Sequence, residues 1–213
     1  MNVKIKLCGI TRLEDALGAA AAGAHAIGLN FVPSSPRCLI DRSIAGKISA
    51  AAKQRGLKVV GVCADMSLPE LEQLANAVPL DALQLHGHEH VTLGHALRGA
   101  LPLKEVWKAY RVAGREDLAR IDAEQFPCAA LLLDAKAGSA LGGTGQTFDW
   151  NVLKSWQRSK QLVLAGGLTP ENVTEAVRLV RPDWVDTASG VEASPGIKSQ
   201  ARMEAFVQAA LEA

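Results

Sequence analysis

Short apolar runs alternate with amphipathic, alanine-rich segments along the whole chain. Eight of these runs have the length of a strand, and each is followed by a segment of helical pattern. The predicted strands are Val3–Cys8, Ala24–Phe31, Leu57–Cys63, Asp81–His86, Leu103–Tyr110, Cys128–Asp134, Gln161–Ala165 and Asp183–Ala188. Strands separated by helices pair in parallel through right-handed crossovers. The pattern therefore predicts a succession of βα units.

Capping residues mark where the intervening helices begin. Thr11 with Glu14 and Ser67 with Glu70 have the spacing of capping boxes, and Thr169 is followed by a proline at the first helical position. The predicted helices run from Thr11 to Ala22, Ile40–Gln54, Pro69–Ala77, from after His86 to Arg98, Arg115–Glu124, from Asp149 to Arg158, from Thr169 to Val180, and Ser199–Leu211.

Eight consecutive βα units most often close into a (β/α)8 barrel, and this is the predicted fold. The alternative is a doubly wound open sheet, which usually has a glycine-rich phosphate loop after its first strand. Gly9-Ile10-Thr11 does not have that pattern. No linker or low-complexity stretch divides the sequence, so residues 1–213 are expected to form one domain.

Composition and charge exclude several other classes of protein. With 48% hydrophobic residues the chain is too apolar to be disordered. The 23 basic and 22 acidic residues give no electrostatic reason to expect nucleic acid or a membrane surface as a partner. No export signal or membrane span is visible, and the four cysteines are widely separated. A cytoplasmic location with free thiols is therefore expected.

In a barrel of this kind, binding and catalytic groups gather at the carboxyl ends of the strands. Gly166 and Gly167 follow the seventh strand, and Ser189 and Gly190 follow the eighth. Loops at these two places commonly bind phosphate, because glycine lets backbone N–H groups approach an anion closely. The pattern favours a phosphate site, although the same glycines could serve only as tight turns.

Two ionisable side chains end strands on different sides of the predicted barrel. Cys8 ends the first strand, and Lys6 on the same face could favour a thiolate that acts as a base or nucleophile. Asp134 ends the apolar sixth strand, where a carboxyl group must be paired or protonated and is suited to act as a general acid. The alternatives are an inert buried thiol and an aspartate that binds its own loop.

Other polar residues are predicted at the same end of the barrel. Arg37 follows a proline after the second strand and could clamp a carboxylate, although it could also be a solvated surface arginine. Gln84 and His86 share one face of the fourth strand, whereas His86, His88 and His90 do not share a face, so no metal site is predicted. The glycine-rich stretch 135–147 is long for this fold and is expected to act as a lid.

Seven blocks of sequence contain these residues and follow one another along almost the whole chain. They are Lys6–Thr11, Ser35–Arg37, Leu83–Gly87, Leu133–Ala135, Gly142–Trp150, Leu164–Val173, and Val185–Glu192 with Pro195–Lys198. Taken together they resemble the phosphoribosylanthranilate isomerase family of tryptophan biosynthesis. Leu7 and Ala188 depart from the usual residues of that family, but neither replaces a residue with a chemical role.

The resemblance implies an Amadori rearrangement that needs no cofactor. The substrate would be N-(5′-phosphoribosyl)anthranilate, and the product 1-(2-carboxyphenylamino)-1-deoxyribulose 5-phosphate. The resemblance assigns the role of general acid to Asp134, that of general base to Cys8 and that of carboxylate site to Arg37, with Asp186 lining the site. It also implies a small-molecule substrate as the only ligand, and a monomer or a homodimer.

Two other readings stay open from the sequence. A dual isomerase that also converts the aminoaldose of histidine synthesis is expected to carry an aspartate where Cys8 stands. A non-catalytic phosphate-binding barrel, acting as a scaffold or sensor, would need neither Cys8 nor Asp134.

Overall fold

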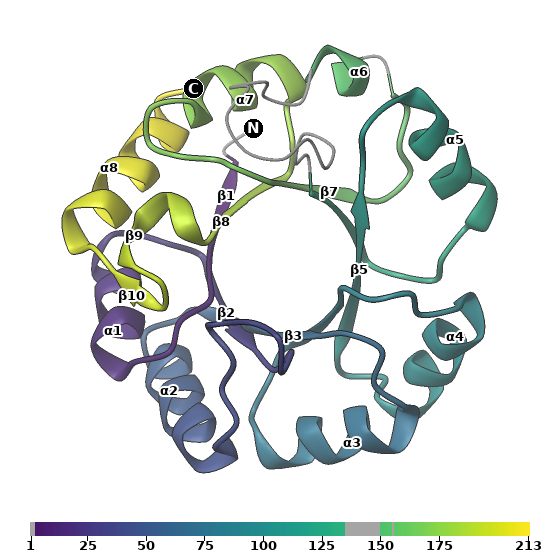
Figure 1. Cartoon of the computed structure of the whole chain (residues 1–213), viewed down its shortest axis with the longest axis horizontal. Helices are drawn as coiled ribbons and strands as arrows, with labels where there is room; N and C mark the ends of the chain where they lie inside the picture. The colour runs from purple at the N-terminus through teal and green to yellow at the C-terminus, as the bar shows by residue number, and fades with distance from the viewer. Residues whose placement is uncertain (1–2, 135–149, 155) are drawn as a thin grey trace.

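In a computed structural model of the chain, the eight predicted strands close into one parallel barrel (Figure 1). The structure describes residues 3–134, 150–154 and 156–213. Strands pair in chain order, and β1 pairs with both β2 and β8, which closes the ring. The helices surround the strands (Figure 1). A (β/α)8 barrel is therefore confirmed, and an open doubly wound sheet is excluded.

The elements have the following bounds. The barrel strands are β1 (Lys4–Cys8), β2 (Ala26–Asn30), β3 (Lys58–Cys63), β4 (Ala82–Leu85), β5 (Glu105–Arg111), β6 (Ala130–Asp134), β7 (Gln161–Ala165) and β8 (Trp184–Thr187). The helices are α1 (Leu13–Ala21), α2 (Arg42–Gln54), α3 (Leu68–Ala77), α4 (Val91–Ala100), α5 (Arg115–Glu124), α6 (Asn151–Lys154), α7 (Val173–Val180) and α8 (Gln200–Leu211). Among the described residues, none of these helices is long and apolar enough to cross a membrane.

Of the three capping signals that fall on described residues, one agrees with the structure and two differ. Ser67 and Glu70 form the predicted capping box of α3, in which the Ser67 N–H donates to Glu70 Oε2 at 2.7 Å. The prediction for Thr11 is wrong: α1 begins after Arg12, because the Thr11 hydroxyl donates to the carbonyl of Gly196 instead. The start of α7 at Thr169 is also wrong.

In α7, the residue that precedes the first helical turn is Asn172. The Thr169 N–H donates to the side chain of Asn172 at 2.8 Å, so the segment between them is a turn. The predicted helix ending at Arg158 is shorter than expected, since α6 covers Asn151–Lys154 and Arg158 is not helical. The cap at Asp149 and the predicted lid at 135–147 lie outside the described residues.

A 3-10 helix and a short hairpin follow β8, and neither was predicted from the sequence. The 3-10 helix η1 (Ser189–Val191) leads into β9 (Glu192–Ser194), which pairs antiparallel with β10 (Ile197–Lys198) before α8 begins. Sequence patterning does not reveal strands this short. The hairpin matters because it brings Glu192 against the residues that follow β2.

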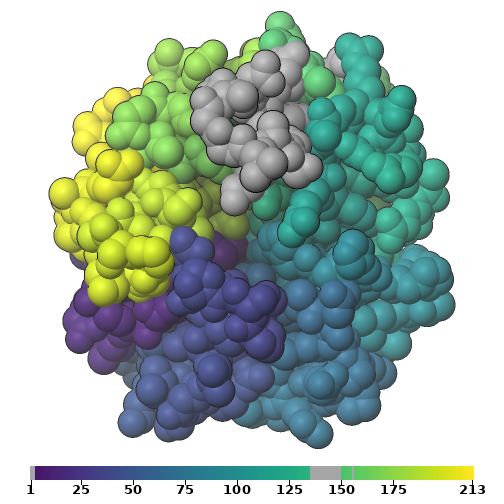
Figure 2. Space-filling model, viewed as in Figure 1, coloured from purple at the N-terminus to yellow at the C-terminus, as the bar shows by residue number. Residues whose placement is uncertain are grey.

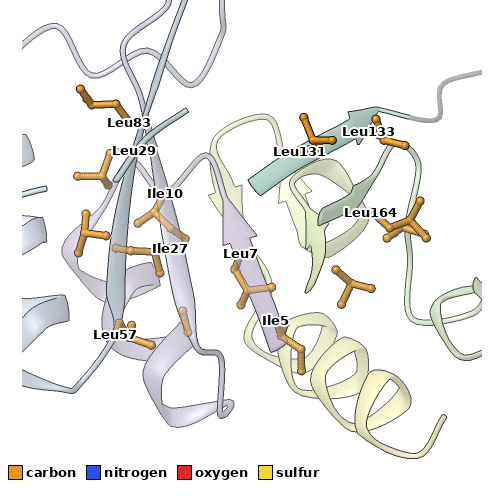
Figure 3. Close-up of a cluster of buried hydrophobic side chains, with 14 of the residues drawn as sticks. Ile5, Leu7, Ile10, Ile27, Leu29, Leu57, Leu83, Leu131, Leu133 and Leu164 are labelled. Atoms are coloured by element: carbon orange, nitrogen blue, oxygen red, sulfur yellow. The ribbon is translucent and has the colours of Figure 1, made fainter. Parts of the chain in front are cut away.

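Each strand presents alternate side chains to two different cores. Ile5 and Leu7 in β1 belong to the large cluster between the barrel and its helices, together with Leu131 and Leu133 of β6 (Figure 3). The intervening residues face the barrel interior, whose apolar cluster includes Trp107, Leu132 and Trp184. Because the side-chain period of a strand is two residues, Lys6 and Cys8 also face inward.

A buried ion pair fixes two of the loops at the carboxyl end of the barrel. Lys108 Nζ in β5 lies 2.7 Å from Glu89 Oε2, and the two side chains are only 3% and 1% exposed. Glu89 Oε1 accepts the backbone N–H groups of Asp65 and Gly87, each at 3.0 Å. One carboxylate therefore connects β5 to the loops after β3 and β4.

Replacing Glu89 by alanine is expected to destabilise the barrel strongly. The substitution leaves the Lys108 ammonium buried without its partner, and such a loss costs about 3–5 kcal/mol. Lys53→Ala is a matched control, because the Lys53–Asp81 pair is 38% and 31% exposed and should contribute less than about 1 kcal/mol. Urea denaturation measures both free energies of unfolding, and losses of similar size in the two variants would contradict the prediction.

Candidate active site

A cavity of about 550 Å³ opens at the carboxyl ends of the barrel strands. Figure 2 shows the surface hollowed near the centre of the view. The predicted site residues that line it are Cys8, Arg37, Gln84, His86, Asp134, Gly166, Gly167, Asp186 and Ser189. Gly190 is not part of the lining. It is buried, and a Cβ there would fall 2.0 Å from the carbonyl oxygen of Leu168.

Cys8 shares the inner face of β1 with a buried ammonium group. Lys6 Nζ lies 2.9 Å from Asp186 Oδ2, and the Lys6 side chain is fully buried. Gly28 in the neighbouring strand makes room for both side chains, because a Cβ there would lie 2.6 Å from Cys8 Sγ and 3.2 Å from Lys6 Cε. Lys6 is therefore held between a carboxylate and a thiol.

The charges around Cys8 act in opposite directions. Burial lowers the pKa of Lys6, but the attraction of Asp186 and Cys8 outweighs it and raises the Lys6 pKa above its ordinary value. Burial raises the pKa of the Cys8 thiol, and the positive charge of Lys6 offsets only part of that effect. The expectation that Lys6 favours the thiolate is thus right in direction, but burial is the larger influence.

Asp134 lies beside a histidine at the barrel mouth. Its Oδ2 lies 3.9 Å from His86 Nε2, which is longer than a hydrogen bond. His86 Nδ1 lies 3.0 Å from Gln84 Nε2, so with this amide orientation Nδ1 accepts and Nε2 carries the ring hydrogen toward Asp134. Burial lowers the pKa of His86, and the opposing attraction of Asp134 does not cancel this effect. The ring is therefore mainly neutral at pH 7.

Three oxygen atoms of residues that line the cavity are buried without a hydrogen-bond donor among the described residues. They are Gln84 Oε1, Asp134 Oδ1 and Asp186 Oδ1. Buried acceptors are normally paired, because leaving one unpaired costs free energy. Their grouping suits a ligand that brings several O–H or N–H groups.

The loops after β7 and β8 lie against each other at one side of the cavity. Gly166 and Gly167 have φ values of +91° and +68°, a conformation that L side chains rarely adopt. Among the described residues, a Cβ at Gly167 would meet no atom within 4 Å, so none of them crowds its backbone. The Thr187 hydroxyl donates to the carbonyl of Leu168 at 2.7 Å and ties the two loops together.

Arg37 lines the cavity, but part of its guanidinium is already engaged. Nε and Nη2 donate to the two carboxylate oxygens of Glu192 at 2.6 and 2.5 Å. The sequence predicted a two-pronged contact from Arg37 to a ligand, and did not foresee this pairing within the protein. Of the five guanidinium N–H groups, three are not used by Glu192.

Arg111 and Glu192 were not among the predicted site residues. Arg111 ends β5 in register with Asp134 and lines the cavity. Arg111 lies on the same inward face of the strand as Trp107 and Ala109. The alternation would have indicated it if the predicted strand had ended at residue 111 rather than 110. Glu192 gave no signal, because its role depends on the unpredicted hairpin.

His90, which also follows β4, has a local structural role. His90 Nδ1 accepts the N–H of Thr92 at 3.3 Å and so caps α4. Within the described part of the chain, no group of three or more histidine, cysteine, aspartate or glutamate side chains is placed to hold a metal ion.

Comparison with known proteins agrees with this arrangement. The family model of N-(5′-phosphoribosyl)anthranilate isomerase matches residues 5–209. The chain belongs to this family. The match spans all eight barrel strands apart from the first residue of β1.

Individual phosphoribosylanthranilate isomerases are similar over nearly their whole length. The enzyme of Pseudomonas aeruginosa strain LESB58 is 46% identical, over 97% of this chain and 94% of its own. The crystal structure of the Thermotoga maritima enzyme has a TM-score of 0.87 and 38% identity, over 99% of this chain and 100% of its own. A structure of the isomerase in complex with reduced 1-(o-carboxyphenylamino)-1-deoxyribulose 5-phosphate has a TM-score of 0.83 and 36% identity, with the same coverage.

Alkylation of Cys8 is expected to need a higher pH than alkylation of a free thiol. Iodoacetamide reacts with the thiolate, and burial raises the pKa of the Cys8 thiol. Peptide mapping by mass spectrometry across a pH series measures the midpoint for each cysteine. Cys128 and Cys63 serve as internal references, since burial raises their pKa values to about 11 and about 12. A Cys8 midpoint at or below that of N-acetylcysteine would contradict the prediction.

Proposed function

We propose that this isomerase converts N-(5′-phosphoribosyl)anthranilate to 1-(2-carboxyphenylamino)-1-deoxyribulose 5-phosphate with Asp134 as general acid and Cys8 as general base. One observation carries the proposal: β1 and β6 bring these two side chains to one cavity that also has features for two anions. An acid and a base must stand on different sides of the sugar to complete the rearrangement.

The first step is the opening of the ribose ring. Asp134 donates its proton to the ring oxygen while the nitrogen lone pair forms the C1′=N bond, so that the C1′–O bond breaks and a Schiff base results. His86 Nε2 lies 3.9 Å from Asp134 Oδ2. Burial lowers the pKa of His86, so its ring rarely carries an extra proton near pH 7, which favours Asp134 as the proton donor.

The second step is the removal of the C2′ proton. Cys8 takes this proton as a thiolate, and the electron pair of the C–H bond moves to form the enolamine. The enolamine then loses its 2′-hydroxyl proton and gains one at C1′, which gives the ketone. Burial makes the Cys8 thiolate a rarer but stronger base, and the adjacent Lys6 ammonium stabilises its negative charge.

The ends of the substrate supply the binding energy that orients it. The open backbone at Gly166 and Gly167, together with Ser189, suits the dianionic phosphate, and Arg37 suits the anthranilate carboxylate. The unpaired oxygens of Gln84 and Asp186 suit the hydroxyl and amine hydrogens between these two ends.

A direct measurement of turnover tests the proposed function. Loss of anthranilate fluorescence on addition of phosphoribosylanthranilate follows the reaction directly. A folded protein that binds phosphate and leaves the fluorescence unchanged would contradict the proposed function. A monomer or a homodimer remains a prediction; the Thermotoga maritima relative is described as dimeric.

Cys8→Ala is expected to lower turnover by roughly a hundred- to ten-thousand-fold, the usual contribution of a positioned acid–base group. Cys128→Ala is the control, because that thiol lies outside the residues that line the cavity. Near-normal turnover of the Cys8→Ala protein would exclude Cys8 as the base.

Asp134→Asn is expected to abolish most of the activity and still bind the product. Asparagine keeps the shape of the side chain but has no carboxyl proton to donate. The fluorescence assay gives kcat, and calorimetry with the reduced product analogue gives the dissociation constant. An active Asp134→Asn enzyme would exclude Asp134 as the acid, and a parallel loss of binding would indicate a role in holding the ligand.

A further inference from the structure

One buried carboxylate connects the two anion-binding regions of the cavity. The Glu192 side chain is 5% exposed and accepts Arg37 Nη2 at Oε2. Its Oε1 accepts Arg37 Nε at 2.6 Å, Lys198 Nζ at 2.9 Å and the Gly196 N–H at 3.2 Å. Lys198 Nζ also donates to the carbonyl of Ala188 at 3.0 Å, in the loop after β8.

These contacts fix the direction in which Arg37 presents its remaining N–H groups. Glu192 uses the edge formed by Nε and Nη2, which leaves a second edge formed by Nη1 and Nη2. The aliphatic part of Arg37 lies over Gly9, where φ is +72° and a Cβ would fall 2.3 Å from Arg37 Cδ. The arginine is therefore held at its stem and at its head while it lines the cavity.

We propose that Glu192 is a positioning residue for substrate recognition: it holds Arg37 so that the second guanidinium edge faces the cavity and binds the carboxylate of the anthranilate ring. This inference rests on the proposed function. A planar carboxylate matches two parallel N–H groups, and that match depends on orientation as well as on charge.

Charge alone and positioning predict opposite effects on carboxylate binding when Glu192 is neutralised. Arg37 and Lys198 carry two positive charges and Glu192 carries one negative charge, so the cluster is cationic. Neutralising Glu192 makes the cluster more positive, which would strengthen the binding of any anion. Positioning predicts weaker binding of the carboxylate, because Arg37 loses the partner that aligns it. The sign of the effect therefore separates the two explanations.

The test compares two ligands that differ only in the carboxylate. One is reduced 1-(o-carboxyphenylamino)-1-deoxyribulose 5-phosphate, and the other is the same compound with an unsubstituted phenyl ring. Their dissociation constants define a carboxylate preference for each protein. The wild type should show a preference of roughly ten- to a hundred-fold, the worth of a bidentate charge-assisted contact.

Glu192→Gln is expected to reduce this preference to a few-fold and to leave binding of the phenyl compound unchanged within about twofold. In steady state, KM should rise more than kcat falls. In an Arg37→Ala background the same substitution should have no further effect on the preference, because Glu192 acts through Arg37. Glu105→Gln is the matched control, since Glu105 pairs with Lys58 and does not line the cavity.

An unchanged or increased preference in Glu192→Gln would overturn the proposal, and so would an equal loss for both ligands. Glu192→Asp covers the case in which Glu192→Gln does not fold. It keeps the negative charge but shortens the side chain, so a smaller drop in preference is expected, and no drop overturns the proposal. Failure of the proposed function is a separate outcome, since the wild type would then neither turn over the substrate nor prefer the carboxylated ligand.

Discussion

Closure of the barrel forces alternate side chains from eight strands into one interior, and every group of the candidate site depends on this constraint. The interior is too narrow to be empty, so each inward position must be apolar, paired or open to the cavity. Lower positions are filled by residues such as Trp107 and Val163. Upper positions contain Cys8, Gln84, Asp134 and Asp186, where a ligand can complete their interactions.

The interior also explains why charged groups occur in pairs at this end of the molecule. Lys6 faces Asp186, Lys108 faces Glu89, and Lys198 shares Glu192 with Arg37. A buried charge without a counter-charge is costly, which explains why each of these cations has an acidic partner. Because the pairs connect different strands and loops, the electrostatic requirement also fixes geometry.

The succession of eight βα units was sufficient to predict the barrel, and with it the position of Cys8, Asp134 and the glycines at the carboxyl ends of the strands. It was not sufficient where a local signal competes with a distant contact. Thr11 has the spacing of a cap, but its hydroxyl binds Gly196 from the far end of the chain. Glu192 reaches Arg37 across 155 positions, a contact that no local periodicity encodes. The balance between burial and Lys6 at the Cys8 thiol likewise depends on packing density, which a sequence does not report.

The two indole rings inside the barrel have a consequence for molecular traffic. Trp107 and Trp184 lie with their ring centroids 5.4 Å apart, and Lys58 Nζ lies within 6 Å of both rings. Both rings are buried in the interior of the barrel, so we expect substrate and product to pass through the opening at the carboxyl ends of the strands. The product then has to leave through the opening by which the substrate entered. Binding of the next substrate therefore has to wait for product release.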